Sequence, residues 1–404
     1  MNRRKKKRTN WGLVGILLVA IGAMFYVNQV VVPATPPLFI PTPTPTTSPE
    51  SYVNQAEQFY SEGKLQQAIE AYKSAIDADP GNPANYIALA RLQVWTGNYD
   101  DAILNTQNAL LKNPNNPLAH AVQGWALGFE EKYGEAELEI KKAIELDPNN
   151  ALAHAYYAEV LIIQGDYELQ DKAIQESRTA RDLDNNLFET HRARGIVLLN
   201  TNNLEEAISE LNAALAINKN IADVHLYLGV TYKALGEYDK AEEALLAAYA
   251  LNPTDTIALT EISRSYFADG RYGQAAQYAE EAIAVDPANP TLHGNLGIAY
   301  YKNEELSKAI DQLSLAVQGG VTDGGQAVEG MPLDYGRVEE YYWYYGFALA
   351  KSNRCNEAVP IFQALLLGVP DDDIAVYNAN AGIDLCRESL GTPPASTEEV
   401  TPTP

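Results

Sequence analysis

Histidine and cysteine are the residues of this 404-residue sequence best suited to bind a metal or to catalyse a reaction. The five histidines, His120, His154, His191, His225 and His293, are 34, 37, 34 and 68 residues apart. This spacing puts them at the same place in successive structural units, and stacked helices lie about 8–10 Å apart. Because zinc ligands lie about 2 Å from the metal, we interpret the histidines as packing residues. We expect no metal site and no cofactor.

The sequence lacks the usual signatures of enzyme active sites. No motif typical of a serine hydrolase, a P-loop nucleotide site, a zinc protease or a dinucleotide-binding fold stands in a usable context. Carboxylates are plentiful, but no pair of them is singled out by the sequence. Outside the repeated units described next, no segment is left over for a catalytic domain. We therefore expect that the chain is not an enzyme.

The histidines belong to a repeating unit that is clearest over residues 222–255. Apolar residues recur there at three- and four-residue steps, Gly236 interrupts them, and Pro253 ends the unit. This pattern indicates two amphipathic helices joined by a turn. The alanine that opens the second helix recurs as Ala68, Ala102, Ala136, Ala173, Ala207, Ala241, Ala275, Ala309 and Ala358.

The unit resembles the tetratricopeptide repeat (TPR), which has a 34-residue period and small residues where its two helices meet. The resemblance implies an all-α, right-handed solenoid of about nine helix-turn-helix repeats, ended by a capping helix over residues 373–390. We expect repeats near residues 49–82, 83–116, 117–150, 151–187, 188–221, 222–255, 256–289, 290–323 and 339–372.

A glycine-rich insertion over residues 318–338 interrupts the period, and we expect it to be a flexible loop. The aromatic run at residues 341–345 opens the next helix. Two interpretations remain for this region. Either the rings pack against the loop and the neighbouring helices, or the loop contacts a ligand.

The N-terminus differs from the rest of the chain. Residues 1–10 hold six basic groups, and residues 11–32 carry no charge. As a helix the second segment would be about 33 Å long, enough to cross a hydrocarbon core of about 30 Å. We predict a single transmembrane helix with the basic end in the cytoplasm and the repeats outside it, in the cell envelope. The alternative is a signal peptide that is cleaved near Ala34.

Charge and composition describe the remaining segments. The formal net charge is −24, and the chain beyond residue 10 carries −30, so we exclude nucleic acid as a partner. Residues 33–49 alternate proline and threonine, which favours an extended linker. The tail over residues 391–404 has the same composition, and we expect it to be disordered.

The two cysteines fall at the C-terminal end of the repeat array. Cys355 begins the second helix of the last repeat, and Cys386 lies near the end of the capping helix. In a TPR-like stack these two helix ends lie side by side. We predict a disulfide, which a location outside the cytoplasm permits. The alternative is a pair of buried free thiols.

The resemblance also implies a concave groove, lined by positions two, five, nine, twelve and thirteen of each repeat. Exposed apolar groups, tryptophan and arginine are common in binding surfaces. We predict that a peptide or protein binds there, with Trp95, Trp125 and Phe129 holding apolar side chains. Arg91 and Arg192 would hold carboxylates of the partner. Ile162, Lys233 and Arg264 complete the predicted groove.

Two functions from different classes follow from these features. The first is a membrane-anchored, non-enzymatic scaffold that presents the groove to a protein partner. The second is a structural protein that associates with glycan or another envelope polymer through its linker and its tyrosines. Substitution of Arg91 and Arg192 would affect the first, whereas substitution in the aromatic run at residues 341–345 would affect the second.

Overall fold

The computed structural model describes residues 10–31 and 48–389. The chain divides into two compact units, residues 1–48 and residues 49–404. The predicted basic N-terminus lies almost entirely outside the described residues. So do nearly all of the predicted linker and the whole predicted tail.

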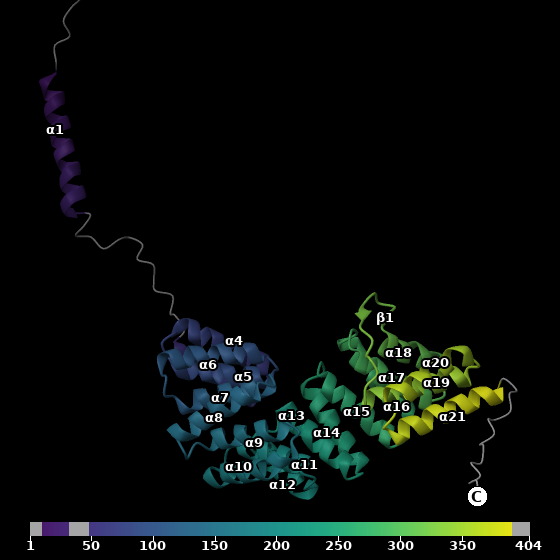
Figure 1. Ribbon diagram of the computed structural model, residues 1–404. Helices are drawn as coiled ribbons and strands as arrows, with labels where there is room; N and C mark the ends of the chain where they lie inside the picture. The colour runs from purple at the N-terminus through teal and green to yellow at the C-terminus, as the bar shows by residue number, and fades with distance from the viewer. Residues whose placement is uncertain (1–9, 32–47, 390–404) are drawn as a thin grey trace, which may run out of the picture. The chain divides into compact units, whose positions relative to one another are not determined.

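The first unit contains helix α1, Trp11–Tyr26, which continues as the π-helical turn η1, Val27–Val31 (Figure 1). The segment Trp11–Gln29 is long and apolar enough to cross a membrane, and it is not buried against any other part of the described chain. No charged side chain lies within it. Its length and composition fit a membrane span or a signal sequence.

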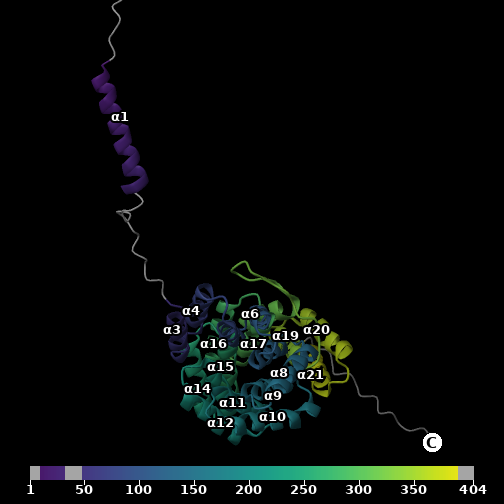
Figure 2. The same ribbon diagram turned by 90° about the vertical axis from the view of Figure 1, so that its left-hand side faces the viewer.

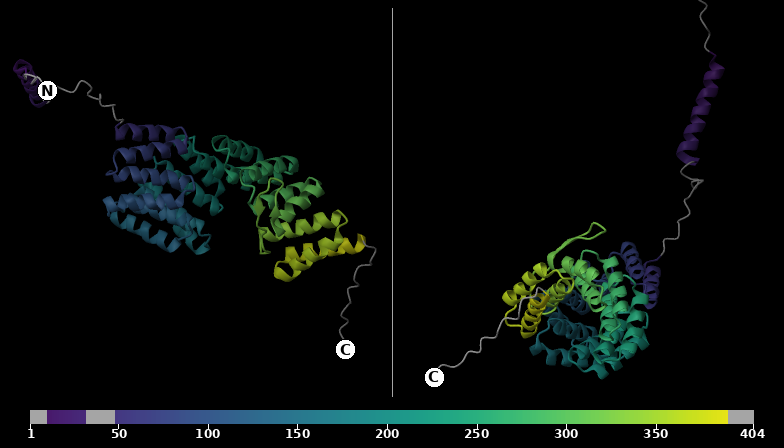
Figure 3. Two further views of the ribbon diagram at one scale, coloured as in Figure 1. Left: turned by 90° about the horizontal axis from the view of Figure 1, so that it is seen from above. Right: turned by 90° about the vertical axis from the view of Figure 1, so that its right-hand side faces the viewer.

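The second unit is an all-α solenoid of successive helix pairs, as predicted (Figures 1 and 3). A last helix, α21, Asp373–Ser389, packs against the two helices before it. The pairs are α3 Pro49–Ser61 and α4 Leu65–Ala78, α5 Pro83–Trp95 and α6 Tyr99–Lys112, α7 Pro117–Phe129 and α8 Tyr133–Leu146, α9 Ala151–Ile163 and α10 Gln170–Leu183, α11 Phe188–Asn200 and α12 Leu204–Ile217, α13 Ala222–Ala234 and α14 Tyr238–Leu251, α15 Thr256–Ala268 and α16 Tyr272–Val285, α17 Pro290–Lys302 and α18 Leu306–Gln318, and α19 Arg337–Lys351 and α20 Cys355–Gly368.

Local sequence explains where several of the first helices begin. Asn116 and Asn150 precede α7 and α9, and their side chains accept hydrogen bonds from the free backbone N–H groups of the first turn. Pro117 fits the first helical position, where no N–H partner is needed. Between α9 and α10 the extra residues of the longer repeat form a short 3₁₀ turn, η2, Tyr167–Leu169.

Within each pair a small residue lets the two helices touch. Gly229 on α13 is typical, because a Cβ added there would lie 2.5 Å from Cγ of Leu245 on α14. Leu245 and Ala248 are buried in the same interface. The marker residues of the repeat therefore form the core that runs along the solenoid.

The glycine-rich insertion forms a two-stranded antiparallel hairpin rather than the expected flexible loop (Figure 2). Its strands are β1, Gly320–Val321, and β2, Ala327–Val328. The following aromatic run packs inward, with Tyr341, Trp343 and Tyr345 buried. The rings therefore pack as the first of the two interpretations states.

Candidate functional site

First helices pack unusually closely in the N-terminal half of the solenoid. Helix α7 packs directly against α9, and α9 packs against α11. Gly128 permits the first of these contacts, because a Cβ there would lie 2.5 Å from Cγ2 of Val160. Since these helices line the concave side, their close approach tightens the curvature of the solenoid.

The tight curvature brings repeats that are distant in sequence into contact. Asn220, in the turn before α13, donates a hydrogen bond from Nδ2 to the backbone carbonyl of Ser61 over 2.8 Å. Arg91 on α5 forms an ion pair with Glu189 on α11. The first and second repeats therefore touch the fifth, and the first turn of the solenoid is closed.

Trp95 lies at this closure. Its ring centroid is 5.4 Å from that of Tyr60 and 5.5 Å from that of Phe188. Nε1 of Trp95 and Nε of Arg91 are buried and have no hydrogen-bond partner among the described residues. A cavity of about 700 Å³ opens beside Arg91, lined by residues of α3, α11 and the end of α12. The closure thus leaves a hollow beside Arg91, at one edge of the concave face, while the two unpaired donors themselves are buried.

The interior of the closed turn is filled by the protein's own polar and aromatic side chains. Trp125 stacks on Tyr156 with 4.3 Å between centroids, and its Nε1 donates to Oε2 of Glu159 over 2.9 Å. Arg192 donates to Glu159 and to Asp223, over 2.6 Å in each case. Burial raises the pKa of the Glu159 carboxyl, and the donors on Arg192 and Trp125 oppose this effect.

This network corrects the predicted groove. Trp125, Ile162 and Arg192 are buried, so the prediction that they face a partner is wrong. Arg91 was predicted to hold a partner's carboxylate, and it instead pairs with Glu189. The physical reason is the closure, which turns concave positions of the second to fifth repeats into an interior. Trp95 remains partly exposed at the edge.

The other predicted groove residues keep part of their surface. Phe129 is half-buried and stacks on Tyr99, with 5.2 Å between ring centroids. Lys233 and Arg264 both pair with Glu261, Arg264 over 2.8 Å. Their charges are therefore partly neutralised by the protein itself.

Several concave positions of the C-terminal half are exposed, although Ile298 and Trp343, at positions nine and five of their repeats, are buried. Ile257 is the second residue of α15 and is 62% exposed. Ile374 and Tyr377 occupy positions two and five of α21 and are 64% and 73% exposed. These residues were missed because α21 was interpreted only as a cap, although its repeat register assigns both positions to the groove.

A basic and aromatic cluster continues the same concave positions. Tyr301 and Tyr344 are in ring contact at 5.1 Å between centroids. Nζ of Lys302 lies 5.4 Å from the Tyr344 ring, and Nζ of Lys351 lies 4.6 Å from the Tyr301 ring. In the part of the chain that the structure describes, neither lysine has a carboxylate within ion-pair distance. The open half of the groove thus combines apolar surface with unneutralised positive charge.

The histidines link each first helix to its surroundings. His154 places Nδ1 2.6 Å from Oε2 of Glu176 and Nε2 3.2 Å from the carbonyl of Pro148. His191 is held in the same way by Glu210 and the carbonyl of Asn185. Both partners of each ring are acceptors, so only the protonated imidazolium donates to both. The hydrogen bond to the carboxylate is the main cause that raises the pKa of each histidine.

These pKa shifts predict that the protein loses stability as the pH rises above about 6.5, the usual histidine value. A raised pKa in the folded state stabilises the fold fully below that value, and the contribution disappears as the pH passes the raised pKa. We expect the melting temperature to fall over this range. Substitution of His154→Gln with His191→Gln should flatten the dependence. An equal slope in the unmodified protein and in the double variant would contradict the assignment.

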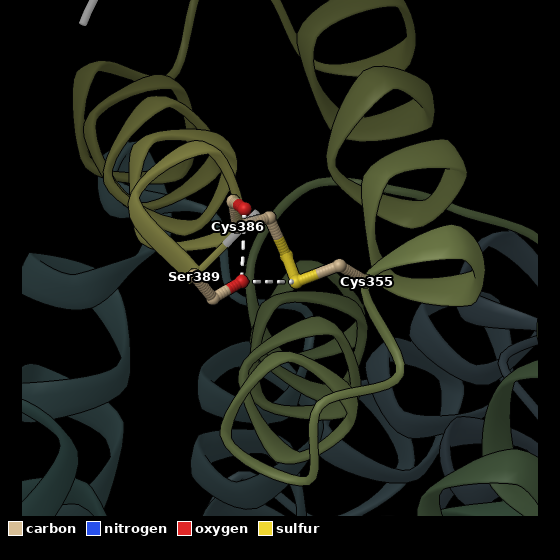
Figure 4. The surroundings of a disulfide bond; sticks show 3 residues. All are labelled: Cys355, Cys386 and Ser389. Carbon is tan, nitrogen blue, oxygen red and sulfur yellow. Dashed lines mark hydrogen bonds between the residues drawn. A yellow bond between two sulfur atoms is a disulfide. The ribbon is translucent and has the colours of Figure 1, made fainter. Parts of the chain in front are cut away.

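A disulfide joins Cys355 at the start of α20 to Cys386 near the end of α21 (Figure 4). The two Cα atoms are 5.4 Å apart. Oγ of Ser389 lies 3.3 Å from Sγ of Cys355 and donates to the carbonyl of Cys386. The last helix is therefore tied covalently to the helix pair that precedes it.

Comparison with known proteins agrees with this architecture. Models of the tetratricopeptide repeat match residues 59–126 and 266–322, 192–256, 139–175 and 119–150. No curated protein matches the chain. Among solved structures, the APC/C hetero-tetramer Cut9–Hcn1 is similar at 13% identity and a TM-score of 0.55, over 85% of this chain and 76% of that one. This likeness concerns the fold alone.

Two shorter solved structures are 26% identical to the chain. YrrB, described as a TPR protein with an unusual peptide-binding site, matches over 47% of this chain and 97% of its own, with a TM-score of 0.30. MamA matches over 41% of this chain and 94% of its own, with a TM-score of 0.34. The repeat models together span more than half of the sequence, from residue 59 to residue 322 with two short gaps. The chain therefore belongs to the tetratricopeptide repeat family.

Proposed function

We propose that this protein is a non-enzymatic scaffold, anchored in the cell membrane by its N-terminal helix, that binds a segment of a partner protein outside the cytoplasm. The partner lies on the open concave face formed by α15, α17, α19 and α21. In this proposal the closed N-terminal turn is a rigid support, and its buried arginines do not contact the partner.

Two features support the anchor and its orientation. The segment Trp11–Gln29 exposes apolar side chains on all sides, which suits contact with lipid. The basic residues before it favour a cytoplasmic N-terminus. The disulfide between Cys355 and Cys386 is consistent with an oxidising compartment for the repeats.

The exposure of Ile257, Ile374 and Tyr377 is the observation that carries the choice of binding face. The fold leaves these large apolar side chains in solvent at positions that the repeat register assigns to the concave face. Exposed apolar surface can mark interaction sites. The lysines Lys302 and Lys351 add positive charge, so the proposed partner segment contains both apolar and acidic residues.

Site-specific photo-crosslinking tests this proposal. A photoreactive phenylalanine analogue at Tyr377, in the full-length chain in its own membrane, should yield a discrete crosslinked protein. The same analogue at Leu138, which is 71% exposed on the outer helix α8, is the matched control and should not yield it. Adding Ile374→Asn should abolish the crosslink at position 377. Identical crosslinks at both positions, or none at either, would show that the concave face is not the binding surface.

The alternative, association with glycan, rested on the linker and on the tyrosines, among them the aromatic run at residues 341–345. In this run Tyr341, Trp343 and Tyr345 are buried in the core and are not available to stack on a sugar, whereas Tyr342 and Tyr344 are partly exposed. No specific observation favours this alternative.

A further inference from the structure

The hairpin insertion is firmly attached at its base. Val328 is buried, and the backbone N–H of Met331 donates to the carbonyl of Ala316 on α18 over 2.9 Å. The hydroxyl of Tyr342 donates to the carbonyl of Met331 over 2.9 Å. The base therefore belongs to the core, while the turn beyond β1 projects from the solenoid (Figure 2).

The projecting tip forms one wall of a cleft of about 810 Å³. The other walls come mainly from the outer helices α16 and α18. Ile283 and Leu315 contribute partly buried aliphatic surface, and Val321 on β1 faces solvent with 67% of its surface exposed. The tip keeps its shape through a hydrogen bond of 2.8 Å from the N–H of Thr322 to the carbonyl of Gln326. The insertion thus adds one wall to a cleft that combines aliphatic and polar surface.

Acidic side chains outnumber basic ones around this cleft. Glu280, Asp311 and Asp323 line it and are exposed. Lys308 is the one lysine among the lining residues; it is paired with Glu305 over 2.6 Å and also interacts with Glu280. A cationic ligand would therefore meet three carboxylates and one lysine that another carboxylate already neutralises.

We propose that this cleft is a second docking surface, which binds a segment of another protein that carries both lysine or arginine and branched aliphatic side chains. The aliphatic side chains would lie against Val321, Ile283 and Leu315, and the cations would lie near the three carboxylates. The cleft is formed by outer helices and the insertion, so it is separate from the concave face and does not depend on the function proposed above.

The probe is the fluorescein-labelled peptide Ser-Lys-Val-Lys-Ser-Val-Lys-Ser, titrated with the full-length chain in neutral maltoside micelles, with empty micelles as the blank. Anisotropy should show saturable binding. Replacing every lysine of the peptide by glutamate, or both valines by serine, should abolish it. Val321→Ser should weaken binding, and Asp311→Lys with Asp323→Lys should weaken it about tenfold or more.

Two control variants separate this surface from general attraction to an acidic protein. Glu205→Lys with Asp239→Lys changes the net charge equally at exposed positions away from the cleft and should leave binding unchanged. Tyr377→Ser alters the concave face and should also have no effect. Absence of binding to the unmodified chain, or an equal loss in the Glu205 and Asp239 variant, would overturn the proposal.

Discussion

Substitution of Arg192→Met is expected to lower the free energy of unfolding by about 3–5 kcal/mol, because it leaves the buried carboxylate of Glu159 without its cation. Asp223 also loses its partner, although its side chain is partly exposed. Guanidinium unfolding followed by tryptophan fluorescence would measure the change, since Trp125 lies in the same network. Because methionine fills a volume similar to that of arginine, the loss of unfolding free energy measures mainly the removal of the positive charge.

The pH dependence of this variant gives a second readout. Without the arginine, the strongest interaction that opposes the effect of burial, which raises the pKa of Glu159, is lost. The loss of unfolding free energy relative to the unmodified protein is therefore largest at neutral pH. It should shrink as the pH falls through that raised value, because the folded state then binds a proton. Adding Glu159→Gln should recover part of the stability, since a glutamine still accepts the hydrogen bond from Trp125. A deficit that neither lower pH nor the second substitution reduces would contradict the role given to Arg192.

Removal of the disulfide should destabilise the C-terminal end of the solenoid by about 3–4 kcal/mol, the value that chain entropy gives for a loop of this size. The effect of Cys355→Ser with Cys386→Ser should be local, because contacts in a repeat array are mostly between neighbours. Hydrogen exchange of the α21 amides should become faster.

Reduction of the unmodified protein is the matched control and should reproduce the exchange pattern of the double variant. Amides of α7 and α9 should keep their protection in both cases, since these helices lie in the closed turn. Unchanged exchange in α21 after reduction would mean that packing alone holds the last helix in place.

Much of the fold could be predicted from local sequence. The 34-residue spacing of small residues such as Gly229 and Ala241 fixes where two helices touch, and this requirement repeats in every unit. The position of Cys355 and Cys386 in the repeat register likewise placed two helix ends side by side. These features depend on contacts between adjacent repeats, and the repeat period in the sequence shows directly which residues are adjacent.

The candidate site depended on curvature, which no single repeat specifies. Trp125 and Arg192 occupy concave positions, and they would be exposed in a more open solenoid. Close packing at Gly128 closes the turn and buries them, and the pairing of Arg91 with Glu189 spans 98 residues of sequence. The glycine and alanine residues of α7 indicate that a neighbouring helix can pack closely against it. The curvature of the solenoid, however, depends on the summed helix-packing geometry of several repeats.

The closure between Asn220 and Ser61 has a mechanical consequence. In an open repeat array each unit contacts only its neighbours, so unfolding spreads from one unit to the next. Such an array can also be stretched elastically along its axis. A contact that skips three repeats makes units one to five cooperative, because none of them can open without breaking the closed turn. The later units have no such constraint among the described residues. The solenoid therefore combines a stiff half, which resists extension, with a compliant half, whose groove can widen around a bound chain.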